Sequence, residues 1–242
     1  MIHLFGREDS SGPAADTGSL THVAVAEWHR NPDIAAAIAE MQAAHPRFAQ
    51  GDIAEATQLF FQYTQDEANQ GDIIARDSNG QLLVEFKTSI RLTPAPSDPT
   101  QKPIVIQGTI DQVRIRNGRP EVWDLKTSKK EPSDQLNMYL YQLGAYALMA
   151  SNHLKTPVRL GGLICARQYS RRGGQAHCLY GNRYSDLSTI IQGIRLAVSL
   201  VRQGRPFPGP GEHCRYCPLG SVAECVPALQ RIVDSNHVIR LP

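Results

Sequence analysis

Two apolar runs joined by a tight-turn signal constrain the fold of this chain more than any other feature. The first run covers residues 103–111 and the second covers residues 120–126. Between them stands Asn117-Gly118, the dipeptide that most strongly favours a two-residue hairpin turn, because both positions accept positive backbone φ. The sequence therefore predicts a pair of adjacent antiparallel strands.

This hairpin can bring the carboxylates of Asp111 and Asp124 to neighbouring positions. Two clustered carboxylates repel each other unless a cation lies between them, and hard oxygen ligands select Mg²⁺ or Mn²⁺. Lys126 lies two residues after Asp124 and so on the same face of its strand. Two carboxylates and a lysine on one face are the parts that metal-assisted phosphodiester hydrolysis requires.

Composition fits a globular protein without a large net charge. With 242 residues, 41% of them hydrophobic, the chain can bury a sizeable core as one domain. The formal charge of +2 excludes a histone-like polycation, so any DNA affinity must come from local basic clusters. No apolar run reaches the length of a membrane span, and the N-terminus lacks a signal-peptide pattern. We therefore expect a cytoplasmic protein whose five cysteines are thiols or metal ligands rather than disulfides.

The order of the expected elements indicates an α/β or α+β fold. Apolar periodicity and turn signals predict helices over residues 20–28, 32–44, 48–69, 133–150 and 185–202. Strands are expected over residues 73–76, 82–86, 159–166 and 177–180, with a proline-containing loop over 93–102. We expect a flexible lead-in at 1–18, a single domain over 19–228 and a tail at 229–242.

The chain resembles the PD-(D/E)XK nuclease superfamily, and within it the RecB-like branch that includes the AddB nuclease domain and CRISPR-associated adaptation exonucleases. Five blocks occur in the order of that family's motifs: a G-x-x-x-[HE] helix at Gly51–Glu55, a G-x-x-D strand at Gly108–Asp111, a D-x-K strand at Asp124–Lys126, a Q-x-x-x-Y helix at Gln142–Tyr146, and a C-terminal cysteine cluster. The resemblance implies a restriction-endonuclease-like core, in which helices flank a mixed central sheet.

The resemblance also implies roles for the residues of the first three blocks. Asp111 and Asp124 would hold one or two Mg²⁺ or Mn²⁺ ions, with the backbone carbonyl of Leu125 as a further ligand. Lys126 would position or deprotonate the attacking water, or stabilise the charged transition state. Glu55 would add a third oxygen ligand at a position where many RecB-like members have His; the alternative is an ordinary surface glutamate.

The Q-x-x-x-Y block places Gln142 and Tyr146 on one helix face, because residues four apart are neighbours on a helix. In the family this pair faces the active site and the DNA. The alternative is that Tyr146 packs into the core. A second block with the same spacing, Gln135 and Tyr139, lies one frame earlier and fits the family pattern less well. The histidines outside the motifs, His22 among them, are expected at the surface or as capping residues.

Two basic clusters are candidates for contacts with a nucleic acid. Arg167, Arg171 and Arg172 lie at an expected hairpin tip that could contact phosphates, although a solvated turn has the same composition. Lys129 and Lys130 follow the D-x-K strand and are better placed to meet a phosphate backbone.

The cysteine cluster, in segment 213–226, consists of Cys214, Cys217 and Cys225, with the close spacing of soft-metal sites. In relatives that carry a [4Fe–4S] cluster, a fourth cysteine lies far upstream, and the matching position here is Asn31. Three alternatives follow: an iron–sulfur cluster with a substitute ligand such as His29, a zinc site, or a lost cluster. Cys165 is expected to be a packed core thiol.

These features together predict a metal-dependent deoxyribonuclease. We expect an exonuclease or a nuclease specific for single strands, which acts on DNA ends or single-stranded DNA in recombination, repair, phage replication or CRISPR adaptation, and which can work within a larger protein complex. The main alternative is a non-catalytic DNA-binding or scaffold protein that keeps the nuclease fold. A ribonuclease or a restriction-type endonuclease on the same core is a third possibility.

Overall fold

The computed structural model describes residues 13–44, 50–66, 73–127, 136–168, 177–179, 187–203 and 238–240. The chain forms two compact units, described separately below. The larger unit contains Ser10–Thr88 and Thr109–Ser185; the smaller contains Ser89–Gly108 and the described parts of Asp186–Pro242. The predicted domain boundaries remain predictions.

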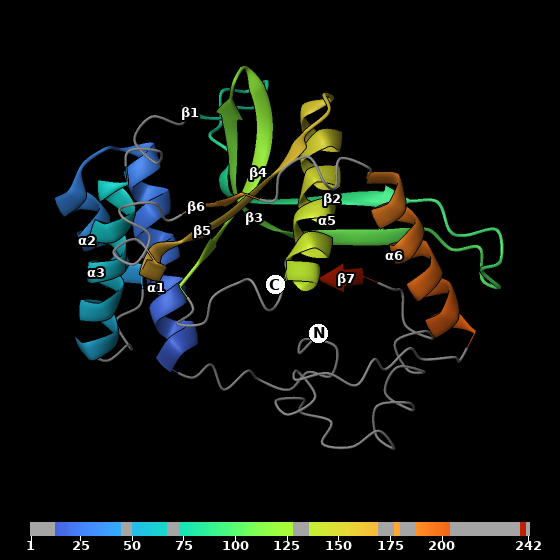
Figure 1. Cartoon of the computed structure of the whole chain (residues 1–242), viewed down its shortest axis with the longest axis horizontal. Helices are drawn as coiled ribbons and strands as arrows, with labels where there is room; N and C mark the ends of the chain where they lie inside the picture. Colours follow the sequence, from blue (N-terminus) through green and yellow to red (C-terminus); the bar gives the residue numbers. More distant parts are fainter. Residues whose placement is uncertain are drawn as a thin grey trace. The chain divides into compact units, whose positions relative to one another are not determined.

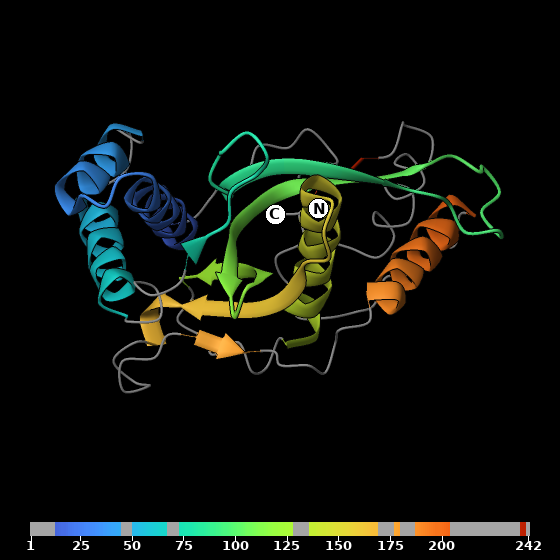
Figure 2. The same cartoon turned by 90° about the horizontal axis from the view of Figure 1, so that it is seen from above.

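Three helices at the N-terminal side form one group in the larger unit: α1 (Pro13–Arg30), α2 (Ile34–Ala44) and α3 (Gln50–Gln65). Both α2 and α3 pack against α1 (Figures 1 and 2). Helix α2 begins where Asp33 Oδ1 accepts hydrogen bonds from two backbone amides of the first turn, at 2.8 and 3.1 Å. Helix α1 begins inside the stretch that the sequence predicted as lead-in, and so extends further toward the N-terminus than expected.

The strands form one mixed sheet of seven strands among the described residues. Its path runs β1-β3-β4-β5-β6, while β2 and β7 also pair with β3. Strands β4 and β5 are parallel, as are β3 and β7; the β1–β3, β3–β4 and β5–β6 pairs are antiparallel. The strands are β1 (Ile73–Ile74), β2 (Val84–Leu92), β3 (Ile104–Arg116), β4 (Arg119–Lys126), β5 (Arg159–Cys165), β6 (His177–Leu179) and β7 (Val238–Arg240). The predicted mixed sheet is confirmed; β7 was not predicted.

The β3–β4 hairpin forms as the sequence predicted. Its two turn residues, Asn117 and Gly118, have φ values of 51° and 73°, the positive values that this turn requires. Gln112 pairs with Trp123 across the ladder. Asp111 precedes Gln112 and Asp124 follows Trp123, so the antiparallel register places Asp111 and Asp124 opposite each other on the two strands.

Alternation along β4 sends its side chains to two different environments. Trp123 and Leu125 belong to the apolar core that also contains Leu20 of α1 and Phe60 of α3. Asp124 and Lys126 face the other way, where Gln142 of helix α5 (Leu136–Leu154) contacts both of them. Helices therefore cover both sides of the D-x-K strand.

A glycine in β5 makes room for the largest side chain of this core. A Cβ atom at Gly161 would lie 2.3 Å from Nε1 of Trp123, which is fully buried. The β4–β5 register shifts at this point, so that Val122 pairs with Leu160 and Trp123 with Gly162. The indole ring thus occupies the space beside the bulge that the side chain of any larger residue at position 161 would need.

The smaller unit contains helix α6 (Leu187–Arg202) and the loop over residues 93–103 that the prolines predicted. Arg202 and Asp98 form an ion pair at 2.6 Å, with side chains that are 1% and 0% exposed. The Arg202 guanidinium also donates to the carbonyl of Lys102, and so ties the loop to the helix. No helix in the described part of the chain is long and apolar enough to cross a membrane.

Candidate active site

The two carboxylates predicted from the hairpin lie at the end of β4. Asp111 and Asp124 are both buried. The backbone amide of Leu125 donates a hydrogen bond to Asp111 Oδ2 at 2.7 Å, which fixes the carboxylate of β3 against the backbone of β4. Burial raises the pKa of Asp111 to about 8, because the charged form loses its hydration.

Lys126 lies in a cage of three side chains. Its Nζ is 2.7 Å from Asp124 Oδ2, donates to Gln142 Oε1 at 3.4 Å and lies 4.8 Å from the centre of the Tyr139 ring. Burial would lower the pKa of Lys126, but the adjacent Asp124 carboxylate outweighs it and raises the pKa above its ordinary value. The lysine is therefore an ammonium ion at neutral pH.

Gln142 links the lysine cage to Tyr146. Its Nε2 donates to Asp124 Oδ1 at 3.1 Å and to the hydroxyl oxygen of Tyr146 at 2.9 Å. Tyr146 is buried, and burial raises the pKa of its hydroxyl. The two interpretations of Tyr146 are thus compatible, since the side chain packs in the core while its hydroxyl contacts the predicted site residue.

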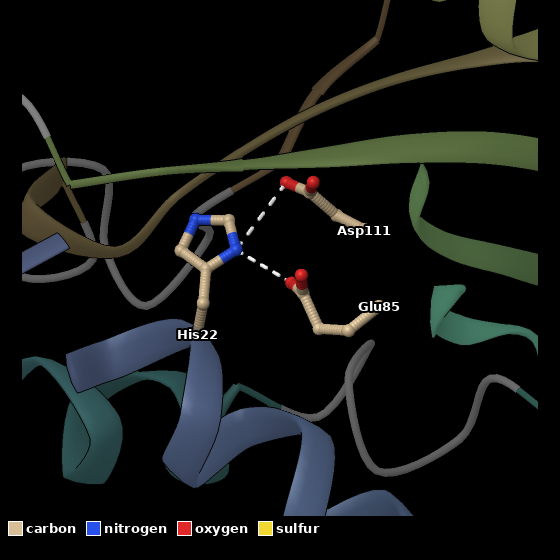
Figure 3. A group of neighbouring side chains, drawn as sticks. All are labelled: His22, Glu85 and Asp111. Carbon is tan, nitrogen blue, oxygen red and sulfur yellow. Dashed lines mark hydrogen bonds and ion pairs between the residues drawn. The ribbon is translucent and has the colours of Figure 1, made fainter. Parts of the chain in front are cut away.

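Helix α1 contributes a histidine to the same place, as Figure 3 shows. His22 Nδ1 lies 2.6 Å from Glu85 Oε1 and 3.7 Å from Asp111 Oδ2. Its Nε2 lies 3.2 Å from the carbonyl oxygen of Leu125, a distance at which an N–H group on Nε2 donates a hydrogen bond. Desolvation would lower the pKa of His22, but the charge of Asp111 and the hydrogen bond with Glu85 outweigh it and raise the pKa to about 9.

These three side chains fit a divalent cation. His22, Glu85 and Asp111 each offer one ligand atom, and the three atoms lie within 4.8 Å of one another. Because Nε2 faces a carbonyl oxygen, Nδ1 is the nitrogen that faces the two carboxylate oxygens. That arrangement requires a positive charge between them, which either a proton on Nδ1 or a cation can supply. The two carboxylate donors are of the kind that Mn²⁺ and Mg²⁺ prefer, and the single imidazole nitrogen favours Mn²⁺ over Mg²⁺.

Comparison with known families agrees with this geometry. The model of the PD-(D/E)XK nuclease superfamily matches residues 2–222 of the chain. The chain belongs to the PD-(D/E)XK nuclease superfamily. No curated protein matches the sequence. Membership confirms the predicted superfamily and its restriction-endonuclease-like fold.

Two residues of this candidate site, His22 and Glu85, were not predicted from the sequence. A signal for His22 existed, since Gly18-Ser-Leu-Thr-His22 has the same G-x-x-x-[HE] spacing as the block that ends at Glu55. A Cβ at Gly18 would lie 3.0 Å from Thr127 Oγ1, so the glycine allows α1 to approach the end of β4 closely. Glu85 has a φ of 46° within a strand, a costly conformation for a non-glycine residue that the sequence does not reveal.

The structure does not place Glu55 in the group formed by His22, Glu85 and Asp111. The Glu55 carboxylate instead pairs with the guanidinium of Arg167, at 2.6 Å, and accepts a hydrogen bond from the hydroxyl of Thr17 at 3.2 Å. These two residues, predicted as a metal ligand and as a DNA contact, thus contact each other. Their predicted roles remain untested.

The other predicted site residues lie outside the described part of the chain: Lys129, Lys130, Arg171, Arg172, Cys214, Cys217 and Cys225. The upstream position of the expected iron–sulfur cluster is described, and Asn31 there is exposed. His29, the suggested substitute ligand, has its Nε2 2.6 Å from the Tyr63 hydroxyl, and burial lowers the pKa of this histidine to about 3. Cys165 is buried, as predicted for a core thiol.

Proposed function

We propose that this protein is a metal-dependent deoxyribonuclease that hydrolyses phosphodiester bonds at the site formed by the D-x-K strand. One observation carries the proposal: Asp111, Asp124 and Lys126 gather at one end of the β3–β4 pair beside a histidine and a third acid, Glu85. Five sequence blocks in the order of the RecB-like branch support an exonuclease or a nuclease for single strands, which acts on DNA ends or single-stranded DNA.

The residues divide between holding a cation and stabilising charge. His22, Glu85 and Asp111 would hold Mg²⁺ or Mn²⁺, with Asp124 as a further oxygen donor nearby. The carbonyl of Leu125, which the sequence suggested as a ligand, instead faces Nε2 on the other side of the His22 ring. A bound divalent ion lowers the pKa of a coordinated water and offsets the negative charge that develops on the phosphate. Glu55, proposed as a ligand from the sequence alone, has less support than Glu85 because its carboxylate pairs with Arg167.

The protonation state of Lys126 favours one of its three predicted roles. A lysine whose pKa is raised by Asp124 has no lone pair to take a proton from water at neutral pH. Its ammonium can donate hydrogen bonds to a phosphate oxygen, on which negative charge grows as the water oxygen forms its bond to phosphorus. The bond from phosphorus to the departing sugar oxygen then breaks. The attacking water gives its proton to bulk water, and the departing oxygen takes a proton from bulk water.

Gln142 keeps the lysine and its partner carboxylate together. Its amide donates to Asp124 and accepts from Lys126, so that the carboxylate and the ammonium are held in one orientation before substrate binds. This pre-organisation lowers the cost of arranging charges during the reaction. We infer that Gln142 acts by positioning, with Tyr146 in turn fixing its amide group.

Cleavage assays with end-labelled DNA test the proposal. Purified protein is incubated with single-stranded and double-stranded DNA in Mg²⁺, in Mn²⁺ and in a chelator, beside Asp124→Ala, Lys126→Ala and the exposed-lysine control Lys102→Ala. We expect cleavage by wild type and by the control in metal alone, and a loss of at least about a hundredfold in the two site variants. A ladder that shortens from one end indicates an exonuclease.

Equal activity in all four proteins would refute the site. If none of the four cuts but all bind DNA, the protein is instead a scaffold that keeps the nuclease fold. The iron–sulfur cluster proposed for Cys214, Cys217 and Cys225 is checked separately by the iron content and visible absorption of protein purified without oxygen.

A further inference from the structure

Beyond the last residue of β4, the ion pair between Arg167 and Glu55 links four segments of the larger unit. Arg167, in the short helix η3 (Ala166–Gln168), donates through Nε to the carbonyl oxygen of Thr127. Its NH1 group pairs with Glu55 Oε1 of α3 at 2.6 Å. The other carboxylate oxygen, Glu55 Oε2, accepts from the hydroxyl of Thr17 in α1 at 3.2 Å. One ion pair thus connects α1, α3, η3 and the end of β4.

The two threonines that the ion pair contacts, Thr127 and Thr17, are close in sequence to the site residues Lys126 and His22. Thr127 follows Lys126 in the chain, so a fixed Thr127 carbonyl limits the directions open to the lysine. Thr17 precedes Gly18, where an added Cβ would lie 3.0 Å from Thr127 Oγ1, and His22 lies one helical turn beyond Gly18 on the same face. The ion pair therefore lies where α1 and β4 must be held together for His22 to meet Asp111.

The ion pair between Arg167 and Glu55 is not explained by a contribution to the stability of the fold. The side chains of Arg167 and Glu55 are 17% and 35% exposed, and ion pairs with this much access to water contribute little to the free energy of folding. Arginine is nevertheless suited to the place, because its planar fork donates from Nε and NH1 in two fixed directions. The distinctive property of this pair is therefore its fixed geometry rather than its contribution to the free energy of folding.

We propose that Glu55 and Arg167 form a positioning clamp, which holds α1 against the end of β4 and thereby sets His22 and Lys126 in place. The clamp acts within the nuclease site proposed above and rests on that proposal. It replaces two separate roles, Glu55 as a metal ligand and Arg167 as a phosphate contact, with a single shared one. Neither clamp residue touches the cation or the substrate.

Mn²⁺ affinity, measured by titration calorimetry, separates the clamp from those roles without any need for cleavage. We compare wild type with Glu55→Gln, Arg167→Gln and the double variant. The clamp predicts that each single change weakens Mn²⁺ binding by about tenfold, as does loss of residues that orient ligands, and that the double variant is no weaker than the weaker single variant. The matched controls Glu27→Gln and Arg30→Gln, from an ion pair at the far end of α1, leave the affinity unchanged.

A metal-ligand role for Glu55 predicts a different pattern. Glu55→Gln alone would then weaken Mn²⁺ binding, and Arg167→Gln would leave it unchanged or strengthen it by removing a competing cation. A phosphate-contact role for Arg167 predicts normal Mn²⁺ affinity in Arg167→Gln, with weaker DNA binding and a salt dependence reduced by about one ion when measured in an Asp124→Ala background. Either pattern overturns the clamp.

Three further results are informative. Thermal unfolding midpoints within a few degrees of wild type show that the variants fold, as expected for a partly exposed pair. If wild type binds Mn²⁺ but does not cut DNA, the nuclease proposal fails. The Mn²⁺ affinities of wild type, the two single variants and the double variant still show whether the clamp exists. If wild type binds no Mn²⁺, both proposals are wrong.

Discussion

Binding of a divalent cation should release protons from the site, and this release can be measured. In the metal-free protein the pKa of Asp111 is raised to about 8 by burial, and that of His22 to about 9 by the carboxylates around it. Because the two groups are coupled, the pair together holds between one and two protons at pH 7 in the folded state. A cation needs the carboxylate of Asp111 and the lone pair of His22 Nδ1, so these protons must leave when it binds.

The size of the effect follows from these two pKa values. Each proton that must leave raises the apparent metal affinity about tenfold per pH unit while the pH lies below the pKa of the group. Because the two groups interact, we expect between one and two protons per cation between pH 6.5 and pH 8. The affinity should thus rise between about tenfold and about a hundredfold per pH unit and level off above about pH 9.

Calorimetry in buffers with different heats of ionisation gives the number of protons directly. His22→Gln should release about one proton fewer than wild type. His153→Gln is the matched control, since that histidine lies 3.4 Å from Asp77, a carboxylate that is not part of the site. Heats that do not depend on the buffer, together with an affinity that is flat from pH 6.5 to pH 8, would refute the reasoning.

Three other predictions follow. Without metal, the free energy of unfolding should fall as the pH rises from about 6.5 to about 9, because both raised pKa values keep protons on the folded state that the unfolded chain has already lost; a flat urea-denaturation profile would contradict this. Gly161→Ala should destabilise the protein by roughly 3 kcal/mol through the clash with Trp123, whereas Gly51→Ala, with no atom within 4 Å of the added Cβ, should stabilise it by up to about 1 kcal/mol; equal midpoints would contradict the packing argument. Tyr139→Leu should lower kcat severalfold while Tyr139→Phe keeps it, because the ring face holds the Lys126 ammonium; equal losses would assign the effect to the hydroxyl.

The parts of this site that could be predicted from sequence are those fixed by local rules. The turn at Asn117-Gly118 sets the register of the hairpin, and the two-residue period of a strand then fixes the relation of Asp111 to Asp124. Lys126 follows from the same period. None of these inferences requires knowledge of how distant segments of the chain pack.

The remaining parts depend on such packing. The G-x-x-x-[HE] spacing occurs in both α1 and α3, and only the approach of α1 to β4 decides that His22 rather than Glu55 lies beside Asp111. Glu85 reaches this place from a backbone conformation with a φ of 46°, which its neighbours in the sequence do not indicate. The pairing of Glu55 with Arg167 joins residues that are 112 positions apart, beyond the reach of any local pattern.

The position of bound Mn²⁺ is the most direct test of the cation site on which this account rests. Crystals of the wild-type protein grown with Mn²⁺ would be measured at a wavelength where manganese scatters anomalously. The account predicts an anomalous peak within coordination distance of His22 Nδ1, Glu85 and Asp111. A peak on Glu55, or a peak at the D-x-K strand that His22 and Glu85 do not contact, would contradict it.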